Sequence, residues 1–160
     1  MELFINSDTS PADTLSLALE LYTTYVRASQ RNLVQVTPLG RSTLTALQID
    51  QVPLLLKSIS EPQPDNSVVK KEARLTNPFT IMLEIARACY LEDVLFAKAD
   101  SVTRNEISQF VEIVERLSPR ELADHVNGHM AMRMFLVGEN ITAADVVVFA
   151  ALAPLFSSEL

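Results

Sequence analysis

The residues whose types and spacing could bind a metal ion lie between positions 121 and 129. His125 and His129 are four residues apart and Glu121 is one turn earlier, so a helix would place all three side chains on one face. Imidazole and carboxylate groups are common zinc ligands. The chain has no third histidine and no His-Glu-x-x-His pattern. We therefore interpret this segment as a solvated helix face and predict no metal site.

The single cysteine, Cys89, is the other side chain that could react. It continues an apolar stripe that includes Met82 and Ile85, and no catalytic base neighbours it, so a small core residue is the better interpretation. One cysteine excludes an internal disulfide and a cysteine-based zinc site. The sequence also lacks a P-loop, a dinucleotide fingerprint and a nucleophile elbow. We predict no catalytic residue and no cofactor.

The element with the clearest positioning role is a helix that begins at Thr142. Its hydroxyl suits the N-cap, and Asp145 follows three residues later, where a carboxylate can accept the Thr142 N–H and favours the positive end of the helix dipole. Ile141 and Val146 can pack as a hydrophobic staple. Residues 146–152 carry no polar side chain, which predicts a helix inside a core. We expect Pro154 to end this helix.

This stretch resembles a signature of the helical domain in glutathione-transferase-like proteins. The resemblance is carried by the residues Arg133-Met134-Phe135-Leu136-Val137-Gly138 and Ile141-Thr142-Ala143-Ala144-Asp145. In that family the threonine and aspartate cap a buried central helix. The motif implies a fold and says little about activity, because its residues are structural.

Composition and charge narrow the class of protein further. The chain has 160 residues, of which 48% are apolar and 21% charged, which is typical of a globular domain. Its net charge is −7, divided as −1 over residues 1–60 and −6 over residues 61–160. Such an acidic surface argues against direct contact with nucleic acid. There is no membrane-spanning run and no signal peptide, so we expect a cytoplasmic protein without membrane contact.

The first part of the chain alternates short strands with helical segments. Ser10 and Asp13 flank Pro11 in the pattern of a capped helix start, and an amphipathic stripe follows. We predict strands over residues 3–5, 33–36 and 52–56, whereas 43–49 is either a short helix or irregular. The resemblance implies a reduced thioredoxin-like half, in which the peptide bond before Pro53 is cis.

The second part of the sequence predicts a series of helices, and each begins at a recognisable N-cap. The predicted starts are Asn77 with Pro78, the box from Thr103 to Glu106, and the box from Ser118 to Glu121. We expect Gly128 to allow close packing on a neighbour. The predicted fold class is therefore α+β and mostly helical, a glutathione-transferase-like fold. It comprises a thioredoxin-like subdomain (1–60), an exposed linker loop (61–76) and an all-α subdomain (77–160).

The resemblance also implies which residues a glutathione site would need. Active transferases use a hydroxyl or thiol near the end of the first strand, where this chain has Ser7, Thr9 and Ser10. We interpret these residues as a loop and a helix cap. The family also uses a Glu-Ser or Gln-Ser pair at the start of its third helix, where this chain has Asn77-Pro78. Proline removes a backbone N–H, so glutathione binding is not expected.

A chain that has this fold but lacks the residues expected of a glutathione site is more typical of a binding module than of an enzyme. Residues 122–138 are similar to the glutathione-transferase-like domains of eukaryotic glutamyl- and methionyl-tRNA synthetases and of multi-synthetase scaffold proteins. We predict a non-catalytic module, part of a synthetase or a tRNA-binding scaffold, that pairs with other such domains. An active glutathione-dependent transferase and an elongation factor 1 subunit are the alternatives. From the family's docking surfaces, the candidate interface residues are Arg41, Leu44, Leu47, Arg133 and Phe156.

Overall fold

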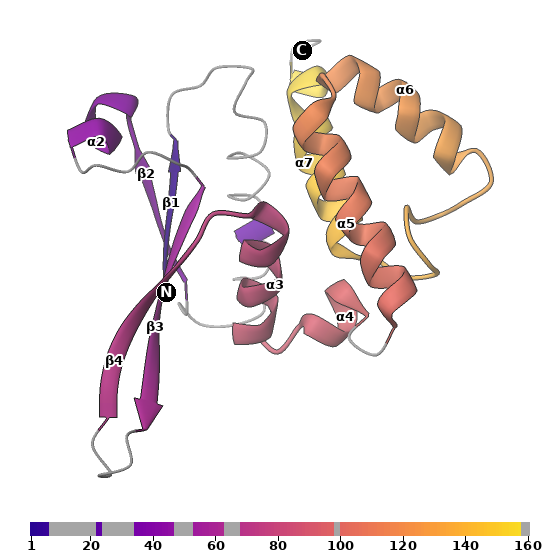
Figure 1. Ribbon diagram of the computed structural model, residues 1–160. Helices are drawn as coiled ribbons and strands as arrows, with labels where there is room; N and C mark the ends of the chain where they lie inside the picture. The colour runs from indigo at the N-terminus through magenta and orange to yellow at the C-terminus, as the bar shows by residue number, and fades with distance from the viewer. Residues whose placement is uncertain (7–21, 24–33, 47–52, 63–67, 98–99, 158–160) are drawn as a thin grey trace.

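The computed structural model describes the chain except residues 7–21, 24–33, 47–52, 63–67, 98–99 and 158–160. A four-stranded sheet stands beside a group of helices, with α3 between the sheet and the long helices α5 and α7 (Figure 1). The strands are β1 (Glu2–Asn6), β2 (Gln35–Leu39), β3 (Leu54–Pro62) and β4 (Val68–Leu75). The helices are α2 (Arg41–Ala46), α3 (Pro78–Ala88), α4 (Glu92–Phe96), α5 (Ser101–Arg116), α6 (Pro119–Met130) and α7 (Ala143–Ser157).

The sheet is mixed, with the strand order β2-β1-β3-β4. Strand β1 pairs parallel with β2 and antiparallel with β3, and β3 pairs antiparallel with β4. Strand β2 continues through Pro38, beyond the predicted end of this strand at residue 36. This is possible because β2 lies at the edge of the sheet, where a residue without an N–H is tolerated.

The predicted linker loop over 61–76 is wrong for most of its length. Residues 68–75 form β4, which pairs with β3 from Leu55↔Leu75 to Pro62↔Val68. The thioredoxin-like part therefore extends to Leu75, beyond the predicted boundary at residue 60. The expected exposure is largely present, because most described side chains of β4 are exposed or half-buried.

One hydrophobic core joins the sheet to the helices. Buried side chains from β1, β3, α3, α5 and α7 belong to a single cluster that includes Leu3, Leu55, Ile81, Val111 and Val147. Tyr22 is completely buried, and its hydroxyl donates to the Met82 carbonyl of α3 at 3.0 Å. Helix α3 thus contacts both halves and fixes one against the other.

Several of the observed helix starts are those predicted from the sequence, and that of α5 differs. Asn77 caps α3 with Pro78 at the first position, and Ser118 and Glu121 form a capping box on α6. The predicted box at Thr103 is wrong, because α5 starts earlier: Asp100 is its N-cap and accepts the Val102 N–H at 2.9 Å.

Two further expectations in the helical half are corrected. Helix α7 continues through Pro154 to Ser157. Gly128 has nothing within 4 Å of the position where a Cβ atom would lie, so it does not serve close packing. Over the described part of the chain, no helix is both long enough and apolar enough to cross a bilayer.

Candidate functional site

The start of α3 is where the resemblance leads us to expect the Glu-Ser or Gln-Ser pair of a glutathione site. Here the Asn77 Oδ1 accepts the Thr80 N–H at 3.0 Å and the Thr80 hydroxyl at 3.1 Å. Pro78, the first helical residue, has no N–H to offer. A helix start binds an anion through its unpaired N–H groups, and two of those positions are closed here. The geometry therefore disfavours a ligand carboxylate at this end of α3.

The other residues predicted for that pocket lie outside the part of the chain that the structure describes. Ser7, Thr9, Ser10 and the cap residue Asp13 lie outside the described residues. Pro53 is buried, but its preceding peptide bond begins at Val52, which is also outside them. The cis bond and the first helix cap therefore stay predictions.

The two histidines serve packing within the helical half. Both rings lie edge-on to Phe110, with centroids 5.1 Å away for His129 and 6.4 Å away for His125. The Nε2 atom of His129 is 2.7 Å from the Leu136 carbonyl oxygen, which ties α6 to the segment before α7. Within the described ranges there is no group of three residues able to hold a metal ion. His129 is half-buried, so the predicted solvated face holds for Glu121 and His125 but not for His129.

Cys89 is buried in the core, as the apolar stripe predicts. Burial raises the pKa of its thiol above the ordinary value, because the core disfavours the charged thiolate. The sulfur is therefore a poor nucleophile at neutral pH.

At the start of α7 the carboxylate of Asp145 accepts three hydrogen bonds. Oδ2 of Asp145 accepts the Thr142 N–H at 2.8 Å and the Thr142 hydroxyl at 2.9 Å. Oδ1 accepts the Leu136 N–H at 2.8 Å, nine residues earlier in the chain. Between these contacts the backbone turns at Gly138, which has φ +67° and so favours glycine. Asp145 thus fixes both the helix start and the preceding loop.

The outer face of α7 exposes two large apolar side chains of the helical half. Phe149 and Phe156 are 67% and 63% exposed, and the half-buried Leu152 lies between them at helical spacing. We call these three residues the α7 stripe. Phe156 was a predicted interface residue, whereas Phe149 was missed because the apolar run predicted burial on every side. The opposite face of α7, including Val147 and Ala151, is fully buried.

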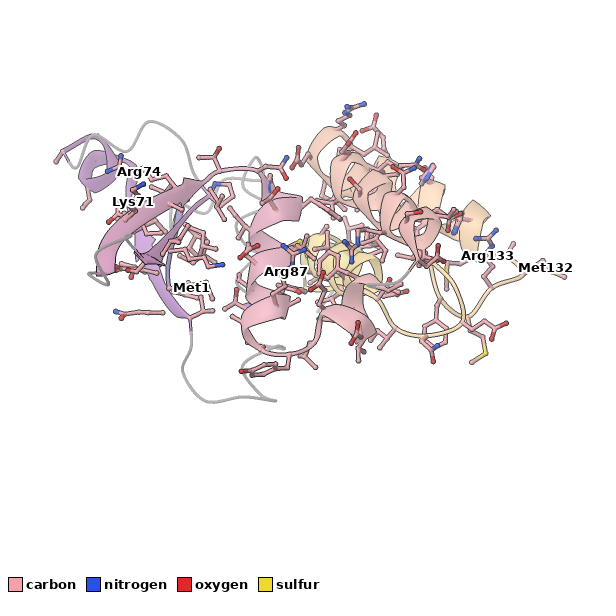
Figure 2. The ribbon with its side chains drawn as sticks, turned by 60° about the horizontal axis from the view of Figure 1, so that its bottom comes forward. Met1, Lys71, Arg74, Arg87, Met132 and Arg133 are labelled. Atoms are coloured by element: carbon pink, nitrogen blue, oxygen red, sulfur yellow. The ribbon has the colours of Figure 1, made fainter. Side chains whose placement is uncertain are left out.

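The remaining interface candidates are divided between the two halves. Arg133 is exposed between Met132 and Met134, which are 96% and 86% exposed, and Figure 2 shows it at the end of the molecule away from the sheet. Its Nη1 is 3.1 Å from His129 Nε2. Arg41 and Leu44 belong to α2 beside the sheet, but their side chains, like Leu47, are outside the description.

Comparison with known proteins gives a likeness in structure alone. No protein-family model matches the sequence, and no curated protein matches it either. Among solved structures, the bacterial transferase BphK in a ternary complex aligns with a TM-score of 0.62 and 14% identity, over 100% of this chain and 85% of that one. A transferase homologue from Drosophila mojavensis with bound glutathione gives 0.62 and 14%, over 98% and 77%.

Human glutathione transferase theta-2, solved with glutathione, gives a TM-score of 0.57 and 12% identity, over 99% of this chain and 73% of that one. All three alignments cover both the sheet and the helices of this chain, because they span 98–100% of it. At these identities the likeness does not extend to activity. The chain has the glutathione-transferase fold.

Proposed function

We propose that this chain is a non-catalytic protein–protein interaction module that docks through the α7 stripe. The observation that carries the proposal is the exposure of Phe149 and Phe156 on a helix whose other face is fully buried. Burying one phenylalanine side chain contributes about 1.5–3 kcal/mol. Grouped exposed apolar side chains on a folded domain are typical of a binding surface. Covering the stripe with a partner would therefore stabilise a complex substantially.

The site chemistry supports binding over catalysis. At the start of α3 the Asn77 side chain occupies the Thr80 N–H, and Pro78 supplies none. A ligand carboxylate there would lose charge-assisted hydrogen bonds worth about 1.5–3 kcal/mol each. This loss supports a domain that has the fold but does not bind glutathione.

We propose as partners the glutathione-transferase-like domains of aminoacyl-tRNA synthetases and their scaffold proteins, assembled in the cytoplasm. Residues 122–138 motivate this choice, because they are similar to the domains appended to those enzymes. The net charge of −7 is consistent with a module that leaves tRNA binding to another domain. In this proposal the segment itself is not an enzyme.

The test uses purified glutathione-transferase-like domains of glutamyl- and methionyl-tRNA synthetases. Binding is measured by calorimetry and light scattering for the wild type and for Phe149→Glu with Phe156→Glu. Losing two buried phenylalanines should weaken binding at least about a hundredfold. The matched control, Val94→Glu with Val102→Glu, places the same charges on exposed positions of α4 and α5 and should bind like the wild type. A strictly monomeric chain that binds neither domain would contradict the proposal.

An active glutathione-dependent transferase is the second candidate, favoured by solved neighbours whose descriptions include glutathione. Retention on immobilised glutathione and turnover of chlorodinitrobenzene test it directly. We expect neither. Saturable turnover by the purified chain would favour the enzyme and overturn the non-catalytic module.

A further inference from the structure

Strands β3 and β4 form a two-stranded ribbon that extends beyond the rest of the sheet. Strand β1 pairs with β3 only from Leu54 to Leu56, whereas the pairing of β3 with β4 continues to Pro62↔Val68. Figure 1 shows this ribbon projecting past the N-terminus, away from the helices. Over the described residues, β3 from Lys57 onwards has a strand partner on one side only.

The outer side of β4 is an edge of the sheet. Strand β4 stands last in the strand order, and β3 is the only described element in extensive contact with it. In an antiparallel ladder every second residue directs its N–H and C=O away from the neighbouring strand. An eight-residue edge of this kind is a template for another extended chain.

The charge of β4 is opposite to that of the rest of the chain. Lys70, Lys71 and Arg74 against Glu72 give β4 a charge of +2, so the remaining residues carry −7 − 2 = −9. The side chain of Arg74 is 73% exposed and lies 3.5 Å from Glu72, which is a weak surface pair. Figure 2 shows Lys71 and Arg74 together on the sheet half, at the opposite end from Met132 and Arg133.

We propose that the β4 edge binds an extended acidic segment of a partner protein by strand addition. The edge would supply main-chain hydrogen bonds, and the cations would face acidic side chains of the added strand. Lys71 and Arg74 are three residues apart in β4, so they lie on opposite faces of the sheet and both faces select acidic neighbours. This surface is separate from the α7 stripe and does not depend on it.

The same charges disfavour a second copy of this chain as the occupant. Two-fold symmetric antiparallel pairing places one residue of β4 directly opposite itself. Centred on Lys70 or Glu72, it brings like charges together. Centred on Lys71 or Ala73, it also pairs Glu72 with a basic residue, but the net charge of +2 on each strand still opposes the pairing. The chain outside β4 is acidic, so it is electrostatically complementary to β4, but edge pairing between copies would oppose basic strand to basic strand.

The test uses the full chain and a nine-residue peptide with glutamates alternating with valine and threonine, acetylated and amidated at its ends. Amide chemical shifts locate the peptide, and its dissociation constant is measured by titration. We expect shifts confined to β4 and the ribbon. Lys70→Glu with Lys71→Glu should weaken binding on the order of tenfold, because two cross-strand attractions become repulsions. The control Arg116→Glu with Arg120→Glu changes the net charge equally and should leave binding unchanged.

Main-chain pairing is tested with two peptides that are N-methylated at alternate residues. Because an added edge strand is bonded on one side only, one methylated set should abolish binding and the other should retain it. Equal loss from both sets, equal binding of a lysine-for-glutamate peptide, or shifts outside the ribbon would overturn the proposal. So would a peptide-independent dimer with the same β4 shifts. The Phe149→Glu, Phe156→Glu variant should bind the peptide normally, so this result is independent of the α7 stripe.

Discussion

The starts of α3 and α7 solve the same problem in two different ways. Both helices must satisfy N–H groups that have no intrahelical partner. At α3 an exposed Asn77 accepts one N–H from the next turn. At α7 the Asp145 carboxylate accepts from Thr142 and also from Leu136, which is distant in the chain, and Thr142 is only 5% exposed. The first cap is local, whereas the second also holds a loop.

The difference shows which features of the fold serve stability and which could have served a ligand. In the family resemblance, the α3 start is where chemistry would be expected, and here it is reduced to an ordinary cap. The α7 start has a purely structural role and is fully developed. The chain therefore has the contacts that build the helical half, while the start of α3 lacks two free N–H donors that a ligand carboxylate could use.

The sharpest test of this contrast is Asp145→Ala. It leaves the Leu136 and Thr142 N–H groups without their carboxylate, and burying an unsatisfied donor costs about 1–3 kcal/mol each. We expect the free energy of unfolding to fall by about 3 kcal/mol or more, measured by urea denaturation. Asp124→Ala, at an exposed position of α6, is the control and should change it by less than about 0.5 kcal/mol. An equal effect of the two substitutions would refute the structural role of Asp145.

Gly138 and Gly128 should respond to alanine in opposite directions. Gly138 has φ +67°, so Gly138→Ala should destabilise the chain by about 1–2 kcal/mol through backbone strain alone. Gly128 lies within α6 with open space around it, so Gly128→Ala should stabilise the chain by about 1 kcal/mol. Thermal unfolding of both variants compares them directly. The same sign for both would mean that the loop before α7 is not held in this conformation.

Helix starts were the features that the sequence predicted well, because a cap is a contact between residues three apart. Asn77 and Ser118 illustrate this. Thr103 was misplaced because Asp100, a few residues earlier, is an equally good cap and the pattern does not decide between them. The Thr103 hydroxyl instead donates to the Asp100 carboxylate.

Features that depend on distant residues were predicted poorly. Strand β4 has no clear alternation of apolar and polar residues, and its pairing with β3 is visible only in the fold. The exposure of Phe149 likewise depends on which neighbours surround α7, which an apolar run cannot reveal. The Leu136 contact of Asp145 spans nine residues and lies outside any capping pattern. The candidate surfaces were therefore found mainly from the structure.

Asn77→Ala measures the weaker of the two caps. Loss of an exposed asparagine N-cap costs about 1 kcal/mol, less than the expected cost of Asp145→Ala. Asn77→Asp should retain the cap and gain up to about 1 kcal/mol from the helix dipole at low salt. Urea denaturation of both variants gives the two values. If Asn77→Ala costs as much as Asp145→Ala, the proposed difference between a local cap and a loop anchor disappears.

The smallest expected effect concerns an ion-pair chain that gives α3 a second kind of support. Glu84 lies between Lys57 Nζ of β3 at 2.5 Å and Arg87 Nη1 at 2.8 Å. The hydrogen bond from Lys57 is the main cause that lowers the pKa of Glu84 below its ordinary value, and Arg87 adds to it. A carboxyl group with a lowered folded-state pKa stabilises the fold above its unfolded-state pKa of 4.5 and loses this contribution as the pH falls through the lowered value.

Glu84→Gln should therefore be less stable than the wild type by about 1 kcal/mol at pH 7, and the difference should shrink only below pH 4.5. Urea denaturation between pH 2 and pH 7 measures it, and high salt should reduce it because ion pairs are screened. Glu112→Gln, which removes an exposed pair with Arg116, should change stability by less than about 0.5 kcal/mol. A difference for Glu84→Gln that grows as the pH falls would show that Lys57 does not hold this carboxylate. Support for α3 would then come only from its cap and its buried face.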